Sequence, residues 1–179
     1  PIALIKLKKN MSVNNFNNIA LVEKGLSFNN GTSLFGGNGI LGNSESTLLI
    51  ANKKDYLSYP GRHTKVHKHN QIVNIKTITI ETLIEEQNIN PKHISLIKMD
   101  IEGGEKIVVP ALINFLNKYK PVFYISLHRC FLRETEINKI INDLFSIYDK
   151  CYLFTENGNK ILINKKYILE KNISCLVFE

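Results

Sequence analysis

The chain has 179 residues, of which 44% are apolar and 22% are charged. These fractions are typical of an ordinary soluble globular protein and exclude a disordered, collagen-like or membrane-bundle protein. The length suits one domain with a hydrophobic core, so we interpret residues 1–179 as a single domain. No apolar run is long enough to span a membrane and no secretion leader is visible, so we expect a cytoplasmic protein without a membrane partner.

The chain carries 23 basic and 16 acidic residues, which gives a net charge of +7, and it begins with proline instead of methionine. We interpret this beginning as that of an excerpt or a processed chain. Only three of the basic residues are arginine, and the lysines are scattered along the sequence. A nucleic-acid binder usually concentrates arginine and aromatic residues on one surface. The charge therefore indicates a solvated surface, and we do not expect a nucleic-acid partner.

Potential metal-binding residues are isolated or placed in a loop. Three cysteines lack zinc-site spacing, and we expect buried, reduced thiols at Cys130, Cys151 and Cys175. A histidine group with the pattern H-x3-H-x-H lacks a nearby carboxylate, so a solvated loop is favoured over a metal site for His63, His67 and His69. We therefore predict no metal site.

The N-terminal half alternates short apolar runs with segments rich in glycine and asparagine. Helical spacing of leucines predicts the first helix. The glycine spacing within residues 29–43 does not fit a phosphate-binding loop. The predicted elements are a helix at 1–14, a strand at 19–22, a loop at 29–43, strands at 46–50 and 71–75, and a helix at 79–87 capped by Thr79.

The C-terminal half shows buried-strand and amphipathic-helix patterns. A helix follows a glycine pair, and Pro110 inside it predicts a kink or a restart. The predicted elements are a strand at 94–101, a helix after residues 103–104, a strand at 121–128, a helix at 134–147, and strands at 151–155, 160–163 and 174–178. This order predicts an open α/β sheet. Ligands of such sheets bind outside the carboxyl ends of parallel strands, which points to residues 100–105 and 126–129.

The densest group of ionisable residues is the segment KMDIEGGE at 98–105. Strand alternation places Lys98, Asp100 and Glu102 on one side. Such clustering is costly unless the charges pair or meet a ligand. Two interpretations stay open here: a ligand site, or an ion pair of Lys98 with one carboxylate while the other residues cap the next helix, which begins near Glu105.

Residues 79–128 resemble the FkbM family of S-adenosylmethionine-dependent methyltransferases. The segment from Asn18 to Gly31, with Gly25-Leu26-Ser27, is similar to an upstream motif of the family, so the resemblance covers nearly the whole chain. The family motifs T-L-D-x-L, K-x-D-x-E-G-x-E and P-x4-E-x-H/N correspond here to TIETL at 79–83, KMDIEGGE at 98–105 and PVFYISLH at 121–128. Ser126 replaces the glutamate of the third motif. The glycine-rich cofactor loop of the family does not occur in this sequence.

The resemblance implies a Rossmann-like class I methyltransferase sheet, mostly parallel with an antiparallel C-terminal strand. Because the cofactor loop is missing, we expect a partial domain that lacks the first strands, leaves the strand at 94–100 without a neighbour and is inactive by itself. The implied cofactor is S-adenosylmethionine. The implied reaction passes a methyl group to an acceptor, and we expect a hydroxyl of a sugar or small metabolite.

The same resemblance assigns roles to individual residues. It implies catalytic roles for Asp100, Glu102 and His128, cofactor contacts for Leu26, Ser27, Asp100 and Gly103, and substrate contacts for Lys98 and Glu105. A histidine suits proton removal because it titrates near neutrality. The alternative for His128 is a strand-end histidine bonded to backbone. The alternative for the whole chain is a non-catalytic α/β module that binds a carbohydrate or polyanion.

Overall fold

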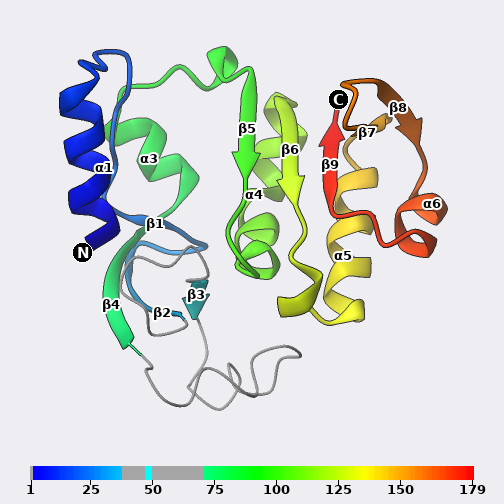
Figure 1. Ribbon diagram of the computed structural model, residues 1–179, viewed down its shortest axis with the longest axis horizontal. Helices are drawn as coiled ribbons and strands as arrows, with labels where there is room; N and C mark the ends of the chain where they lie inside the picture. The colour runs from blue at the N-terminus through cyan, green and yellow to red at the C-terminus, as the bar shows by residue number, and fades with distance from the viewer. Residues whose placement is uncertain (1, 38–46, 50–70) are drawn as a thin grey trace.

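The computed structural model describes residues 2–37, 47–49 and 71–179, and its strands form two sheets flanked by helices (Figure 1). The predicted α/β class is confirmed. Within the described residues, every helix is too short or too polar to cross a lipid bilayer. The histidine group at 63–69 lies outside the described residues.

The first sheet has four strands in the order β1-β4-β2-β3. Its members are β1 (Gly25–Leu26), β2 (Gly31–Gly37), β3 (Thr47–Leu49) and β4 (Gln71–Ile78). All residues of β2 pair antiparallel with β4, from Gly31 opposite Thr77 to Gly37 opposite Gln71. The loop predicted at 29–43 is therefore wrong at 31–37. The strand predicted at 19–22 is also wrong, because those residues do not form a strand.

Two helices in the first half agree with the sequence prediction. Helix α1 (Ile2–Val13) matches the helix expected at 1–14. Helix α3 (Ile80–Glu86) begins after Thr79, whose hydroxyl accepts a hydrogen bond from the Thr82 amide at 3.2 Å. This side-chain bond satisfies one of the amides that a helix leaves free in its first turn. A short 3-10 turn, η1 (Pro91–His93), then leads into the second sheet.

The second sheet has five strands in the order β5-β6-β9-β7-β8. They are β5 (Leu96–Met99), β6 (Val122–Ser126), β9 (Cys175–Phe178), β7 (Cys151–Phe154) and β8 (Lys160–Ile163). In this sheet only β5 and β6 pair in parallel, and in the first sheet only β1 and β4 do. The expectation of a mostly parallel sheet is therefore wrong for the described residues. The antiparallel C-terminal strand is confirmed. Strand β5 lies at the edge, as expected, because β6 is its one partner among the described strands.

The hydrophobic core lies between the second sheet and two long helices, α4 (Glu105–Tyr119) and α5 (Glu134–Phe145), which lie behind the strands in Figure 1. Helix α4 continues through Pro110 as one helix, so the predicted restart is wrong. The 3-10 turn η2 (Arg129–Phe131) precedes α5, and α6 (Lys165–Glu170) was not predicted. Fully buried core residues include Leu112, Leu116, Phe123, Ile125, Ile141, Leu144, Leu176 and Phe178.

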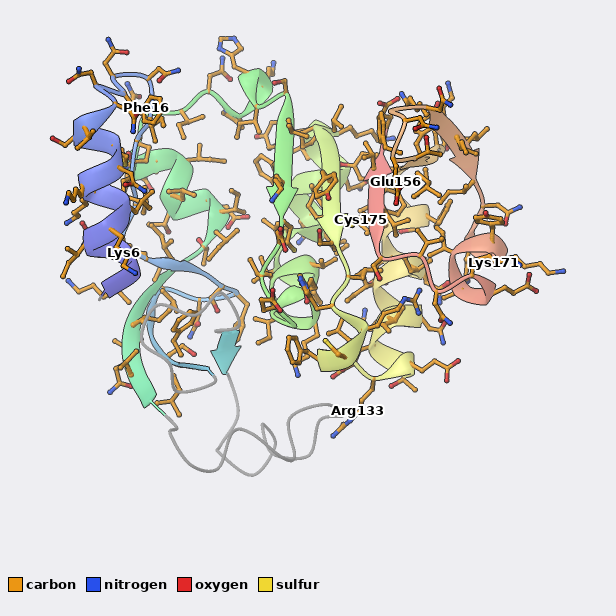
Figure 2. The ribbon with its side chains drawn as sticks, in the orientation of Figure 1. Lys6, Phe16, Arg133, Glu156, Lys171 and Cys175 are labelled. Atoms are coloured by element: carbon orange, nitrogen blue, oxygen red, sulfur yellow. The ribbon has the colours of Figure 1, made fainter. Side chains whose placement is uncertain are left out.

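The surface carries two of the three cysteines. Cys151 on β7 is buried as predicted, but Cys130 and Cys175 are exposed, which corrects the expectation of three buried thiols. Cys175 is the first residue of β9, and its side chain lies outside the hydrophobic core (Figure 2). The labelled basic residues Lys6, Arg133 and Lys171 lie on different sides of the molecule (Figure 2). This dispersal agrees with the scattered charge of the sequence.

Candidate active site

Two adjacent parallel strands bring the predicted site residues together. Strands β5 and β6 pair with Met99 opposite Ile125. Asp100 directly follows β5, and His128 comes two residues after β6. Because parallel strands end at the same edge of a sheet, the side chains of Asp100 and His128 lie close together at the carboxyl ends of β5 and β6.

His128 is the centre of this group. Its Nε2 atom lies 3.3 Å from Asp100 Oδ1 and 3.3 Å from Glu102 Oε1, and its Nδ1 atom lies 2.7 Å from Glu105 Oε1. The imidazole is 19% exposed. The structure thus brings the three predicted catalytic residues into contact. Both ring nitrogens face carboxylates, so His128 is not the backbone-bonded histidine of the alternative interpretation.

A left-handed turn positions Glu102. Strand β5 ends at Met99, and Glu102 has a φ of 52°, followed by Gly103 with a φ of 91°. Residues with side chains rarely adopt such angles, whereas glycine adopts them freely. Strand alternation therefore does not carry Glu102 to its place; the turn after the strand folds it back toward His128.

Gly103 is also required by packing. A Cβ atom at this position would lie 2.6 Å from the Cβ of Phe131. The Phe131 ring in turn stacks on the His128 ring, with centroids 6.4 Å apart and planes 23° apart. The missing side chain of Gly103 thus lets Phe131 approach and support the imidazole.

Glu105 lies beneath the group and is fully buried at the first position of α4. Burial raises the pKa of its carboxyl, and the hydrogen bond to His128 opposes that rise. Its Oε2 atom has no hydrogen-bond partner among the described residues. A fully buried carboxylate cannot touch an acceptor in the open site. The geometry favours a role in holding His128 over the substrate contact implied by the resemblance.

Lys98 occupies the outer rim of the group. Its ammonium lies 3.1 Å from Asp100 Oδ2, and the two side chains are 60% and 45% exposed. Exposed ion pairs of this kind contribute little to stability. The ion-pair interpretation therefore accounts for one oxygen of Asp100, while Oδ1 of the same carboxylate faces His128.

The cofactor contacts implied by the resemblance fall in two places. Leu26 ends β1 and packs on the core, and the next residue, Ser27, donates its amide to the Ile78 carbonyl at 2.9 Å. The Ser27 hydroxyl is buried and has no hydrogen-bond partner among the described residues. Ser27 is only 2% exposed, so the cofactor contact expected of it stays a prediction. Gly103 fits less directly, because Phe131 fills the space beside its Cα.

A cavity lies beside α5 and α6, and of its lining residues only Arg129 falls within the ranges 100–105 and 126–129 that the strand-end rule indicated. Its volume is about 430 Å³. Arg129 lines it, and the guanidinium donates to the Ile168 and Ile173 carbonyls at 3.2 and 3.1 Å. Burial lowers the pKa of this guanidinium. The lining residues are Arg129, Leu132, Glu134, Ile137, Leu169 and Asn172.

Comparison with known proteins identifies one family. The methyltransferase FkbM domain matches this chain over residues 7–160. Searches of curated proteins and of solved structures gave no significant match. The matched range includes the three motifs at 79–83, 98–105 and 121–128, and with them His128 and the three carboxyl residues that contact it. Because the match extends over far more than half of the sequence, the chain belongs to the methyltransferase FkbM domain family.

Proposed function

We propose that this chain forms the acceptor side of an S-adenosylmethionine-dependent methyltransferase that methylates a hydroxyl oxygen of a sugar or small metabolite. The observation that carries the proposal is the approach of Asp100 and Glu102 to His128 at the carboxyl ends of β5 and β6. Family membership supports methyl transfer and disfavours the non-catalytic binding module.

Methyl transfer to a hydroxyl requires that the acceptor and the methyl donor be aligned and that the hydroxyl lose its proton. In the reaction, a bond forms between the acceptor oxygen and the methyl carbon while the carbon–sulfur bond breaks. When bound, S-adenosylmethionine supplies this electrophilic methyl group. The acceptor hydroxyl loses its proton to His128 Nε2 or to the Asp100 carboxylate, which lie 3.3 Å apart. Glu102 and Glu105 would stabilise a protonated imidazole through the contacts described above.

The remaining site residues bind and orient. We assign Leu26, Ser27, Asp100 and Gly103 to the cofactor side, and of these Asp100 has an exposed polar side chain that can contact a ligand directly. Lys98, at the exposed rim, is assigned to the acceptor. Holding both reactants in line is a large part of the catalysis of such a displacement.

The test uses the full-length protein, methyl-labelled S-adenosylmethionine and a panel of sugars and hydroxylated metabolites. We expect label in a product whose mass has grown by one methylene unit. Asp100→Asn and Glu102→Gln should abolish the product while the circular dichroism spectrum stays unchanged.

Asp143→Asn is the matched control, because it makes the same acid-to-amide change in a surface ion pair with Lys139. This variant should keep full activity. The proposal fails if no acceptor is labelled, or if the two site variants work as well as the control.

A further inference from the structure

Three potential metal ligands converge in the same site. Asp100, Glu102 and His128 each offer one ligand atom, and these atoms all lie within 4.8 Å of one another. We propose that the three residues bind a divalent cation, with Mn²⁺ as the ion that best fits two carboxylates and one imidazole. Carboxylates suit Mg²⁺ and Mn²⁺, and imidazole suits first-row transition metals, so Mn²⁺ satisfies both.

The distances fit one shared ion. At a metal–ligand distance of about 2.1 Å, adjacent ligand atoms lie about 3.0 Å apart in octahedral and about 3.4 Å apart in tetrahedral geometry. His128 Nε2 lies 3.3 Å from Asp100 Oδ1 and 3.3 Å from Glu102 Oε1. The ligand atoms of Asp100 and Glu102 lie within 4.8 Å of each other, so rotation of the two carboxylates would bring all three atoms around one ion.

A second observation comes from behind the imidazole. Glu105 Oε1 lies 2.7 Å from His128 Nδ1, and Glu105 is fully buried. Metal-binding histidines commonly donate their other ring N–H to such a carboxylate, which fixes the tautomer with the lone pair on the ligating nitrogen. In that tautomer the lone pair of Nε2 faces two carboxylate oxygens. Positive charge between them would remove the repulsion.

Carboxyl groups surround the proposed position of the ion. Asp100 and Glu102 approach His128 Nε2, Glu105 approaches Nδ1, and Lys98 contacts the outer oxygen of Asp100. A divalent cation would balance the negative charge of the carboxylates that bind it.

The effect on catalysis rests on the proposed function. A bound cation lowers the pKa of a coordinated hydroxyl and stabilises the oxygen anion. His128 would then act as a ligand, and the proton of the acceptor would leave to Asp100 or to water.

The binding test needs neither cofactor nor acceptor, so its failure is separate from failure of the methyl transfer. The protein is treated with EDTA and dialysed, and Mn²⁺ is titrated while electron paramagnetic resonance measures the free ion. We expect one saturable site per chain, with nitrogen coupling from an imidazole ligand in the pulsed spectrum.

Variants locate the ion. Asp100→Asn and Glu102→Gln should each weaken Mn²⁺ binding more than tenfold, and His128→Asn should remove the nitrogen coupling. Glu105→Gln, which acts through His128, should weaken binding about 10–100-fold. Asp143→Asn should bind Mn²⁺ as the unchanged protein does. No saturable binding, binding without nitrogen coupling, or equal binding by the site variants and the control would overturn the proposal.

Discussion

The glycine that supports the imidazole allows a quantitative test of the site's packing. Gly103→Ala would place a methyl group 2.6 Å from the Cβ of Phe131 at a φ of 91°. Gly158 provides the matched control, because its φ is 78° and a Cβ there would meet nothing within 4 Å. Both substitutions force alanine into a left-handed conformation, but only the first also causes a collision.

The two costs can be separated. A left-handed conformation costs an alanine roughly 1–2 kcal/mol, which is the whole expected loss for Gly158→Ala. Overpacking a buried contact adds about 1–3 kcal/mol, so Gly103→Ala should lower the free energy of unfolding by about 2–5 kcal/mol. The difference between the variants therefore measures the collision with Phe131.

Urea unfolding of the two variants gives these free energies from the midpoints, provided that the slopes agree. We expect a clearly lower midpoint for Gly103→Ala than for Gly158→Ala. Equal midpoints would refute the reasoning, because they would show that Phe131 moves away without cost. Gly103→Ala should also reduce methyl transfer, since the displaced ring stacks on His128.

The other predictions concern the core and the sheet edge. Tyr148→Phe removes a buried hydrogen bond of 2.7 Å to the Pro121 carbonyl and should cost about 1–3 kcal/mol in urea unfolding; an unchanged midpoint would contradict this. Burial raises the pKa of Tyr148 to about 12 from 10.0. The neutral hydroxyl therefore contributes its full stabilisation below pH 10, and this stabilisation is lost as the pH rises through 12. Urea unfolding across this range should show the free energy of unfolding fall, and fall less in Tyr148→Phe. Burial also raises the pKa of Cys151 to about 12, so a thiol reagent should label two cysteines quickly and Cys151 only after unfolding, and quick labelling of all three would count against the described packing. Leu96, 56% exposed on edge strand β5, should promote association, and Leu96→Lys should reduce light scattering; equal scattering would argue against a sticky edge.

Local signals predicted the elements that depend on local interactions. The capping residue Thr79 predicted helix α3, and the apolar face of residues 134–145 predicted helix α5. Strand β2 is different, because its glycine-rich sequence disfavours a strand. Its extended conformation is stabilised by pairing with β4, which is distant in the sequence. Helix α6 carried a signal that the prediction missed, since the Asn164 side chain accepts from the Tyr167 amide as a helix cap.

The site was predicted from its motif, and its internal arrangement was not. Spacing placed Asp100 and His128 at adjacent strand ends, which the structure shows. The left-handed turn at Glu102 and the burial of Glu105 depend on how α4 packs after the turn. No periodicity in the sequence reports such a contact, so the partner of His128 Nδ1 could only be found in three dimensions.

The central place of β9 in the second sheet determines when this sheet can assemble during synthesis. Among the described strands, β9 alone connects the β7–β8 hairpin to β6. A nascent chain that has been synthesised only as far as Ile173 would hold two separate pieces of sheet and would lack the buried side chains of Leu176 and Phe178. Translation must therefore deliver residues 175–178 before these pieces can join, and until then both expose apolar edges that a holding chaperone could cover.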